Sequence, residues 1–142
     1  MDPRSWIVCG ALLGAIGVGI GAYGAHGLKE RLRQQEFSEE TIVKRLDQCQ
    51  VAVRYQMTHA LAMVLVGALA LGRRSRWLHV AGTCFLLGVV LFSGMLYSQA
   101  LFGQSIHLLI PLGGLAFIVG WCALAVAGCR LGSKAGEHSK NS

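Results

Sequence analysis

Four long apolar stretches alternate with polar ones along the chain, and this pattern predicts four membrane-spanning helices. A helix that crosses the hydrocarbon core of a bilayer needs about 20 mostly apolar residues. Stretches of that kind cover residues 6–25, 51–72, 78–101 and 111–129. We therefore predict an all-α integral membrane protein, a four-transmembrane-helix bundle of up-down topology that forms one domain over residues 1–130. Residues 131–142 are polar and are expected to form a disordered tail.

Residues 26–50 form the one long polar stretch, and its second half has the pattern of a short amphipathic helix. Ser38 is a favourable N-cap, and Glu39 and Glu40 then place negative charge in the first helical turn. Apolar residues follow at helical spacing: Ile42, Leu46, Cys49 and Val53. We predict a helix that begins near Ser38, lies on or above the membrane surface in its first turns and continues unbroken into the second span.

The composition also points to a membrane. Charged residues make up 14% of the chain, whereas a soluble domain has about 25%. From Trp77 to Cys129 there is no Asp, Glu, Lys or Arg, which excludes a water-facing surface over that length. The formal net charge of +6 arises from basic residues near the ends of apolar segments. Because no basic face or recognition motif accompanies the charge, we expect the lipid bilayer as partner and no nucleic acid.

The short loops indicate an orientation. Arg73, Arg74 and Arg76 lie between the second and third spans, whereas the loop between the third and fourth spans contains no Lys or Arg. The first loop is also basic, so the total count separates the two orientations only weakly. We predict a multi-pass protein of the cell (inner) membrane with both termini in the cytoplasm.

Small residues recur at helical spacing on one face of the first span and one face of the fourth. The first face consists of Gly10, Gly14, Gly17, Gly21 and Gly24. The second consists of Gly113, Ala116, Gly120, Ala123 and Ala127. Close backbone approach through small residues stabilises helix pairs in lipid. We expect both faces to line the interior of a tight bundle, and the alternative is a glycine-lined dimer interface.

Polar side chains gather near three predicted span ends. They are Tyr23, His26, Tyr55, Gln56, His59, Ser93 and Tyr97. Up-down topology would place all of them at the membrane face of the first loop, where we expect His26, His59 and Tyr97 to approach one another. Such a polar cluster is either a site that binds a ligand or relays protons, or a hydrogen-bond network that joins helices.

The sequence does not have the residue patterns of an enzyme. No catalytic residue, metal ligand set or cofactor motif is predicted, because no nucleophile elbow, phosphate loop or carboxylate pair is present. The five cysteines lack metal-ligand spacing and are expected to act as small packing residues. No Asp or Glu lies within any predicted span, which argues against an ion-coupled transporter.

Several segments carry a family resemblance. They are GAYGAHGLK (Gly21–Lys29), VRYQMTHALA (Val53–Ala62), Ala81–Tyr97 and PLGGLAFIVGW (Pro111–Trp121). In these segments the chain resembles the domain-of-unknown-function 423 family, also called the transmembrane protein 256 family. The resemblance implies a small multi-pass membrane protein and supplies no reaction. The seven polar residues above coincide with the family's motif residues, whereas the first loop is longer and more charged than in the commoner pattern.

We therefore expect a non-enzymatic membrane protein with a role in structure, assembly or interaction within the bilayer. The alternative is a protein that binds or conducts a small solute or protons through the polar cluster. A ligand-shaped cavity between Tyr23, His59 and Tyr97 would favour the alternative. Formation of a homo-oligomer and contact with other membrane proteins stay open at this level.

Overall fold

The computed structural model describes residues 2–72, 75–104 and 106–139, and all regular structure in these ranges is helical. Arg73 and Arg74, which the orientation argument uses, lie outside the described residues. The helices are α1 (Pro3–His26), α2 (Leu28–Gln34), α3 (Glu39–Gly72), α4 (Arg76–Gly88), η1 (Val89–Ser93), α5 (Gly94–Phe102) and α6 (Leu109–Ser139). The segments α4, η1 and α5 follow one another without a break and form the third span.

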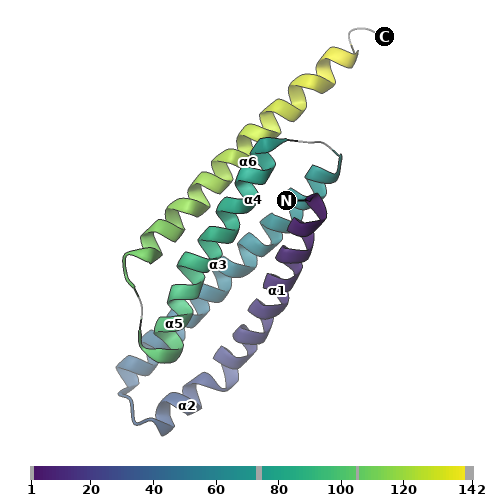
Figure 1. The fold of residues 1–142 in the computed structure, drawn as a ribbon. Helices are drawn as coiled ribbons and strands as arrows, with labels where there is room; N and C mark the ends of the chain where they lie inside the picture. Colours follow the sequence, from purple (N-terminus) through teal and green to yellow (C-terminus); the bar gives the residue numbers. More distant parts are fainter. Residues whose placement is uncertain (1, 73–74, 105, 140–142) are drawn as a thin grey trace.

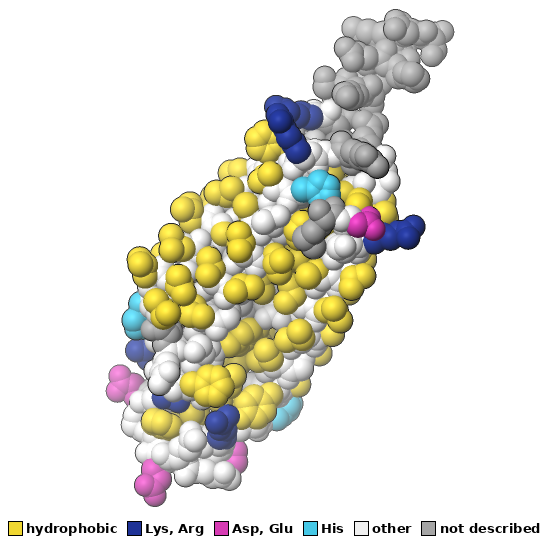
Figure 2. Space-filling model, viewed as in Figure 1, with side chains coloured by type: hydrophobic (Ala, Val, Ile, Leu, Met, Phe, Trp, Pro, Cys, Tyr) yellow, Lys and Arg dark blue, Asp and Glu magenta, His cyan; other side chains and the backbone are white. Residues whose placement is uncertain are grey.

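Four helices are long and apolar enough to cross a membrane, so the predicted fold class is confirmed. Hydrophobic side chains cover the middle of the molecule, and the charged side chains gather toward its two ends (Figure 2). The start of α3 also agrees with the sequence, because the Thr41 amide donates a 3.3 Å hydrogen bond to Ser38 Oγ. From there α3 continues for 34 residues without interruption, about 50 Å at 1.5 Å per residue.

The four spans form two hairpins that pack side by side. Helix α1 packs along α3, α6 packs along α4 and η1, and α3 joins the two hairpins through α4 and α5. In Figure 1, α1 and α6 consequently lie at opposite flanks with α3 and α4 between them. The two small-residue faces therefore do not meet in a common interior, because each is covered by the neighbouring helix of its own hairpin.

The glycine face of α1 allows close contact with α3. A Cβ atom added at Gly10 would lie 2.6 Å from the Ala60 carbonyl oxygen, and one at Gly17 would lie 2.8 Å from the Met57 sulfur. Gly14 differs, because a Cβ added there would meet nothing within 4 Å. On α6, Gly113 and Gly120 face the third span in the same way. The face thus serves packing within the chain, although one of its glycines is free of the contact.

Two tryptophan–histidine pairs connect the hairpins. The indole N–H of Trp6 on α1 donates to Nδ1 of His79 on α4 at 3.2 Å. The indole N–H of Trp121 on α6 donates to Nε2 of His59 on α3, also at 3.2 Å. Each flanking helix is therefore hydrogen-bonded to the inner helix of the other hairpin. Hydrogen bonds of this kind hold helices together in lipid, where burial of apolar surface does not.

Helix α2 was not predicted from the sequence. It follows α1 directly after Gly27, and its Leu28 and Leu32 are fully buried. They pack with Ile42 and Cys49 of α3 and with Tyr97 of α5 in a separate core cluster. Seven residues are too few for a hydropathy pattern to stand out among charges, but this cluster supplies the burial that a short helix needs.

Two further segments differ from the sequence-based picture. Residues 89–93 form a π-helical turn, η1, which widens the third span in the middle. The structure also continues α6 as helix to Ser139, where the sequence predicts a disordered tail from residue 131. Extending an existing helix adds one hydrogen bond for each residue fixed, which favours continuation past the apolar stretch. Residues 140–142 lie outside the described part.

Candidate functional site

The Gln56 side chain of α3 reaches the middle of the neighbouring span α1. Gln56 donates a 2.7 Å hydrogen bond to the carbonyl oxygen of Leu13, and its amide also faces Gly17. These two contacts bracket the middle of α1, which runs from Pro3 to His26. Because α1 is about as long as the bilayer core is thick, the Gln56 amide lies near the bilayer centre. The sequence predicts Tyr55, Gln56 and His59 in the opening turns of the second span. Gln56 reaches deeper than that and His59 follows it by one turn, whereas Val53, beside Gly21, keeps Tyr55 nearer to the first-loop end.

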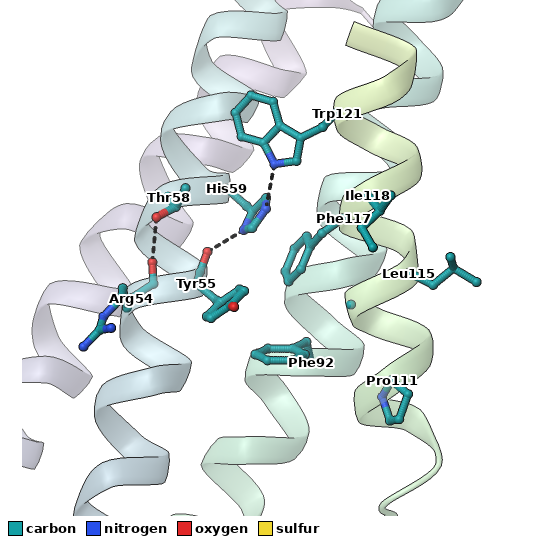
Figure 3. A pocket seen from close by; sticks show the side chains of 11 residues that line it. Arg54, Tyr55, Thr58, His59, Phe92, Pro111, Leu115, Phe117, Ile118 and Trp121 are labelled. Carbon is teal, nitrogen blue, oxygen red and sulfur yellow. Dashed lines mark hydrogen bonds between the residues drawn. The ribbon is translucent and has the colours of Figure 1, made fainter. Parts of the chain in front are cut away.

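His59 is held from both sides of its ring. Trp121 donates to Nε2, and an indole can only donate, so Nε2 carries no proton. Nδ1 then donates to the carbonyl oxygen of Tyr55 at 2.7 Å. The ring also stacks on Phe117, with centroids 3.5 Å apart and planes 9° apart. The imidazole is thus neutral and saturated in hydrogen bonds. Figure 3 shows both bonds, one to Trp121 and one to the Tyr55 carbonyl.

Aromatic rings extend this arrangement toward the first-loop end. Tyr55 packs on Phe92 with centroids 4.5 Å apart, and Phe92 meets Phe117 edge-on at 5.9 Å. Phe92 belongs to η1, whose wider turn contains one extra residue in the helical repeat. Deep in the bundle, Phe85 meets the Trp121 ring at 5.1 Å. These rings form a continuous wall between α3, η1 and α6.

A cleft of about 720 Å³ opens against this wall between α3 and α6. Arg54, Tyr55, Thr58 and His59 line its α3 side, and Phe92 forms part of its floor. The α6 side runs from Pro111 through Leu115 and Ile118 to Trp121. In Figure 3, α3 stands on one side and α6 on the other. Because both helices are membrane spans, the mouth of this cleft faces the lipid.

Two polar groups in the cleft have no partner among the residues that the structure describes. The Arg54 guanidinium makes no hydrogen bond or ion pair, although the Arg54 carbonyl accepts from Thr58 Oγ1 at 2.9 Å. The Tyr55 hydroxyl likewise makes no hydrogen bond, and 41% of that residue is exposed. Both groups remain available to a ligand in the cleft, unlike the nitrogens of His59.

The predicted polar cluster is divided over three places. Tyr23 and His26 are exposed at the first-loop end of α1, where Arg31 donates to the Tyr23 hydroxyl at 3.5 Å. The hydroxyls of Ser93 and Tyr97 are buried without a hydrogen-bond partner among the described residues. His59 lies deeper, with Trp121 and Phe117. The structure therefore does not bring His26, His59 and Tyr97 together, since the depth of His59 had been placed too near the first loop.

Trp121, Phe117 and Arg54 are the site residues that sequence reasoning missed. Trp121 gave a usable signal, because tryptophans in membrane proteins favour span ends and this one lies in the apolar middle of α6. Arg54 also gave a signal, because it is the one Asp, Glu, Lys or Arg within the predicted second span. Phe117 carries no signal that separates it from other apolar residues. Within the described ranges, no group of three or more His, Cys, Asp or Glu side chains could hold a metal ion.

Comparison with known proteins places these features in a family. The profile described as "Protein of unknown function (DUF423)" matches residues 20–114. A UPF0382 membrane protein of Staphylococcus haemolyticus is 38% identical over 125 residues, which cover 87% of this chain and 94% of that protein. The UPF0382 inner membrane protein YgdD of Escherichia coli K12 is 34% identical over 140 residues, 97% of this chain and 99% of that protein. No solved structure matches.

Proposed function

The chain belongs to the DUF423 family of multi-pass membrane proteins, and we propose that this protein is a non-enzymatic interaction protein that binds an amphipathic molecule of the bilayer in the cleft between α3 and α6. The observation that carries the proposal is the shape and depth of that cleft. Its α6 wall extends from Pro111 to Trp121, about 15 Å at 1.5 Å per residue. This length equals half of a hydrocarbon core about 30 Å thick, so the cleft matches one acyl chain of one leaflet.

The chemistry of the lining supports a binding role. Phe92, Leu115 and Ile118 provide apolar contact, and Tyr55 and Arg54 provide unpaired polar groups at one end. Small-molecule sites usually combine a mostly apolar wall with a few polar groups that orient the ligand. An amphipathic occupant satisfies both parts at once, because its tail replaces lipid along the wall and its polar end meets the unpaired groups.

A proton relay receives less support. His59 is the one intramembrane histidine of the cleft, and both of its nitrogens are already engaged. Protonation of Nε2 would break the bond from Trp121 and place a charge near the bilayer centre. The sequence has no Asp or Glu between Gln48 and Cys129 to compensate that charge. The role that fits His59 is to position Trp121 and Phe117 as walls of the cleft.

The second candidate is an assembly role in which another membrane helix fills the cleft. The observation that favours it is that α6 buries little of its surface within the chain and leaves Leu115, Ile118 and Val119 exposed. The helix could come from a second copy or from another membrane protein. Both candidates predict an occupied cleft, but they differ in whether the occupant is a lipid-sized molecule or a protein.

Filling the cleft with a side chain tests the proposal. Gly114 lines the cleft, and a Cβ added there would meet only Phe92, at 4.0 Å. Gly114→Leu should therefore fold and occupy the site. Gly128 lies on the same helix, and a Cβ added there meets nothing within 4 Å, so Gly128→Leu is the matched control. Native mass spectrometry of protein released from mild detergent counts the retained lipids.

We expect the wild type and Gly128→Leu to retain one lipid-sized adduct that Gly114→Leu loses. If all three proteins retain the same adducts, the proposal fails. If Gly114→Leu instead dissociates an oligomer that the other two form, the assembly candidate replaces the binding candidate.

A further inference from the structure

Arg54 is the charged group of the cleft, and its position calls for a counter-ion. Arg54 lines the cleft together with Pro111 and Leu115 of α6, which places it beside the apolar part of that helix. Arg54 is exposed, and an arginine side chain keeps its positive charge under all ordinary conditions. A charged side chain at this depth costs several kcal/mol unless it is paired or reaches the headgroups.

The chain itself offers no such counter-ion. Asp47 is the nearest acidic residue that precedes Arg54 on α3, and no Asp or Glu follows until Glu137. Asp47 lies two turns toward the first-loop end of the helix and is exposed there. Of the described residues, Arg33 and Glu39 form the ion pair that the structure contains. The guanidinium therefore remains without an anionic partner at the rim of an apolar cleft.

We propose that the ligand of this cleft is an anionic phospholipid from the leaflet on the first-loop side. This inference rests on the proposed function, because it assigns the chemical class of the molecule that the cleft holds. The phosphate group accepts charge-assisted hydrogen bonds from Arg54, whose planar fork suits phosphate oxygens. The Tyr55 hydroxyl donates to the same polar end, and one acyl chain extends along Leu115 and Ile118 toward Trp121.

The direction of the cleft selects the leaflet. Helix α3 begins at the first-loop end and α6 begins on the same side, so Arg54 and Pro111 are the cleft residues nearest to that membrane face. Figure 3 shows Arg54 at the outer side of α3, with Pro111 at the lower end of α6 and Trp121 at the opposite end. With its side chain extended toward the first-loop end, Arg54 meets the headgroup of a lipid of that leaflet, and the tail of that lipid runs along the aromatic wall.

Free phosphate fits less well, because most of the lining is apolar and a hydrated ion gains nothing from Phe92, Leu115 or Ile118. The other competing arrangement is that Arg54 extends to the membrane surface and is satisfied by water and bulk headgroups. In that arrangement the protein would bind anionic and zwitterionic lipids equally well.

A competition between two lipids with identical acyl chains decides between these arrangements. Detergent-solubilised full-length protein is titrated with phosphatidylglycerol and phosphatidylcholine, and native mass spectrometry counts each adduct. Both lipids carry a phosphate, but the choline ammonium of phosphatidylcholine compensates its negative charge. We therefore expect the wild type to prefer phosphatidylglycerol by about tenfold, the size of one charge–charge interaction near a protein surface. Arg54→Gln should lose this preference, Arg54→Lys should keep part of it, and Arg4→Gln at the opposite membrane face should keep all of it.

The outcomes separate the two proposals. A wild type without preference overturns the anionic class, and it does so even if Arg54→Gln fails to fold. In that case, loss of all lipid in Gly114→Leu still supports the proposed function, whereas retained lipid in Gly114→Leu removes it. Inorganic phosphate is added as a third arm. If it displaces phosphatidylglycerol at equal concentration, the site recognises a free anion, and the lipid assignment is wrong.

Discussion

Replacing Gly10 and Gly14 by alanine, one at a time, tests whether α1 and α3 pack through their glycine contacts. The two residues lie one turn apart in α1, and both substitutions gain the same intrinsic helix propensity, about 1 kcal/mol. At Gly10 the new Cβ would lie 2.6 Å from the Ala60 carbonyl oxygen and 3.0 Å from the Val64 amide nitrogen. At Gly14 it would meet nothing within 4 Å. The propensity terms cancel in the comparison, and the packing term remains.

The size of the packing term follows from the atoms involved. Ala60 O and Val64 N belong to the backbone of α3, so they cannot rotate away as a side chain would. The two helices must therefore separate locally, and overpacking of this kind costs about 1–3 kcal/mol. The same separation loosens the neighbouring contacts of Gly17 and Gly24. We expect Gly10→Ala to be less stable than Gly14→Ala by about 2–3 kcal/mol, with Gly14→Ala at or slightly above the wild type.

Reversible unfolding in mixed micelles of increasing SDS content, followed by circular dichroism, gives the three free energies of unfolding. Equal values for the two variants would refute the reasoning, because they would show that α1 and α3 are not in contact at Gly10. A large loss of stability in Gly14→Ala would also refute the reasoning, because it would require a packing partner for Gly14.

A double-mutant cycle of His59→Phe and Trp121→Phe measures the hydrogen bond between these two residues. We expect a coupling energy of about 0.6 kcal/mol, and at most about 1.7 kcal/mol. A coupling energy of zero would show that the bond does not form. Gly88→Ala should lower the free energy of unfolding by about 1–3 kcal/mol and reduce lipid retention, because its Cβ would displace the Phe117 ring. Unchanged lipid retention would show that Phe117 does not contribute to the binding site. If both termini are cytoplasmic, a membrane-impermeant thiol reagent should label Glu40→Cys and spare Ser75→Cys in intact cells, and the reverse pattern would invert the orientation. The native Cys49 cannot report on this, because only 1% of it is exposed.

The sequence predicted the four long apolar helices because each is apolar over about the thickness of a bilayer, a property of composition alone. It also predicted the start of α3, because Ser38 and the acidic first turn act locally. Depth was harder to predict. Helix α3 is much longer than the bilayer core, and hydropathy placed its membrane part at residues 51–72. The contacts of Gln56 with Leu13 and Gly17 shift that part toward the first loop.

That shift explains why the predicted cluster separated. Tyr23 and His26 are close to the end of a helix whose limits the sequence defines, so their place at the first-loop end agrees with the expectation. His59 was expected near the first loop because hydropathy starts the second span at residue 51. The partner of His59, Trp121, is 62 residues away, and no local pattern in one sequence connects the two. The π-helical turn that brings Phe92 to the cleft has no sequence signal either.

The central claim, that a lipid occupies the cleft between α3 and α6, is tested most directly by photo-crosslinking in membranes. A phospholipid with a diazirine on its acyl chain is incorporated, activated and mapped by mass spectrometry. Leu115 and Ile118 line the cleft and are 56% and 61% exposed, while Leu12 and Ile16 on the outer side of α1 are matched at 60% and 53%. A retained lipid should label the cleft pair well above the α1 pair and saturate at low probe content, with Gly114→Leu abolishing the difference. Equal labelling of both pairs, rising in proportion to the probe, would contradict the claim.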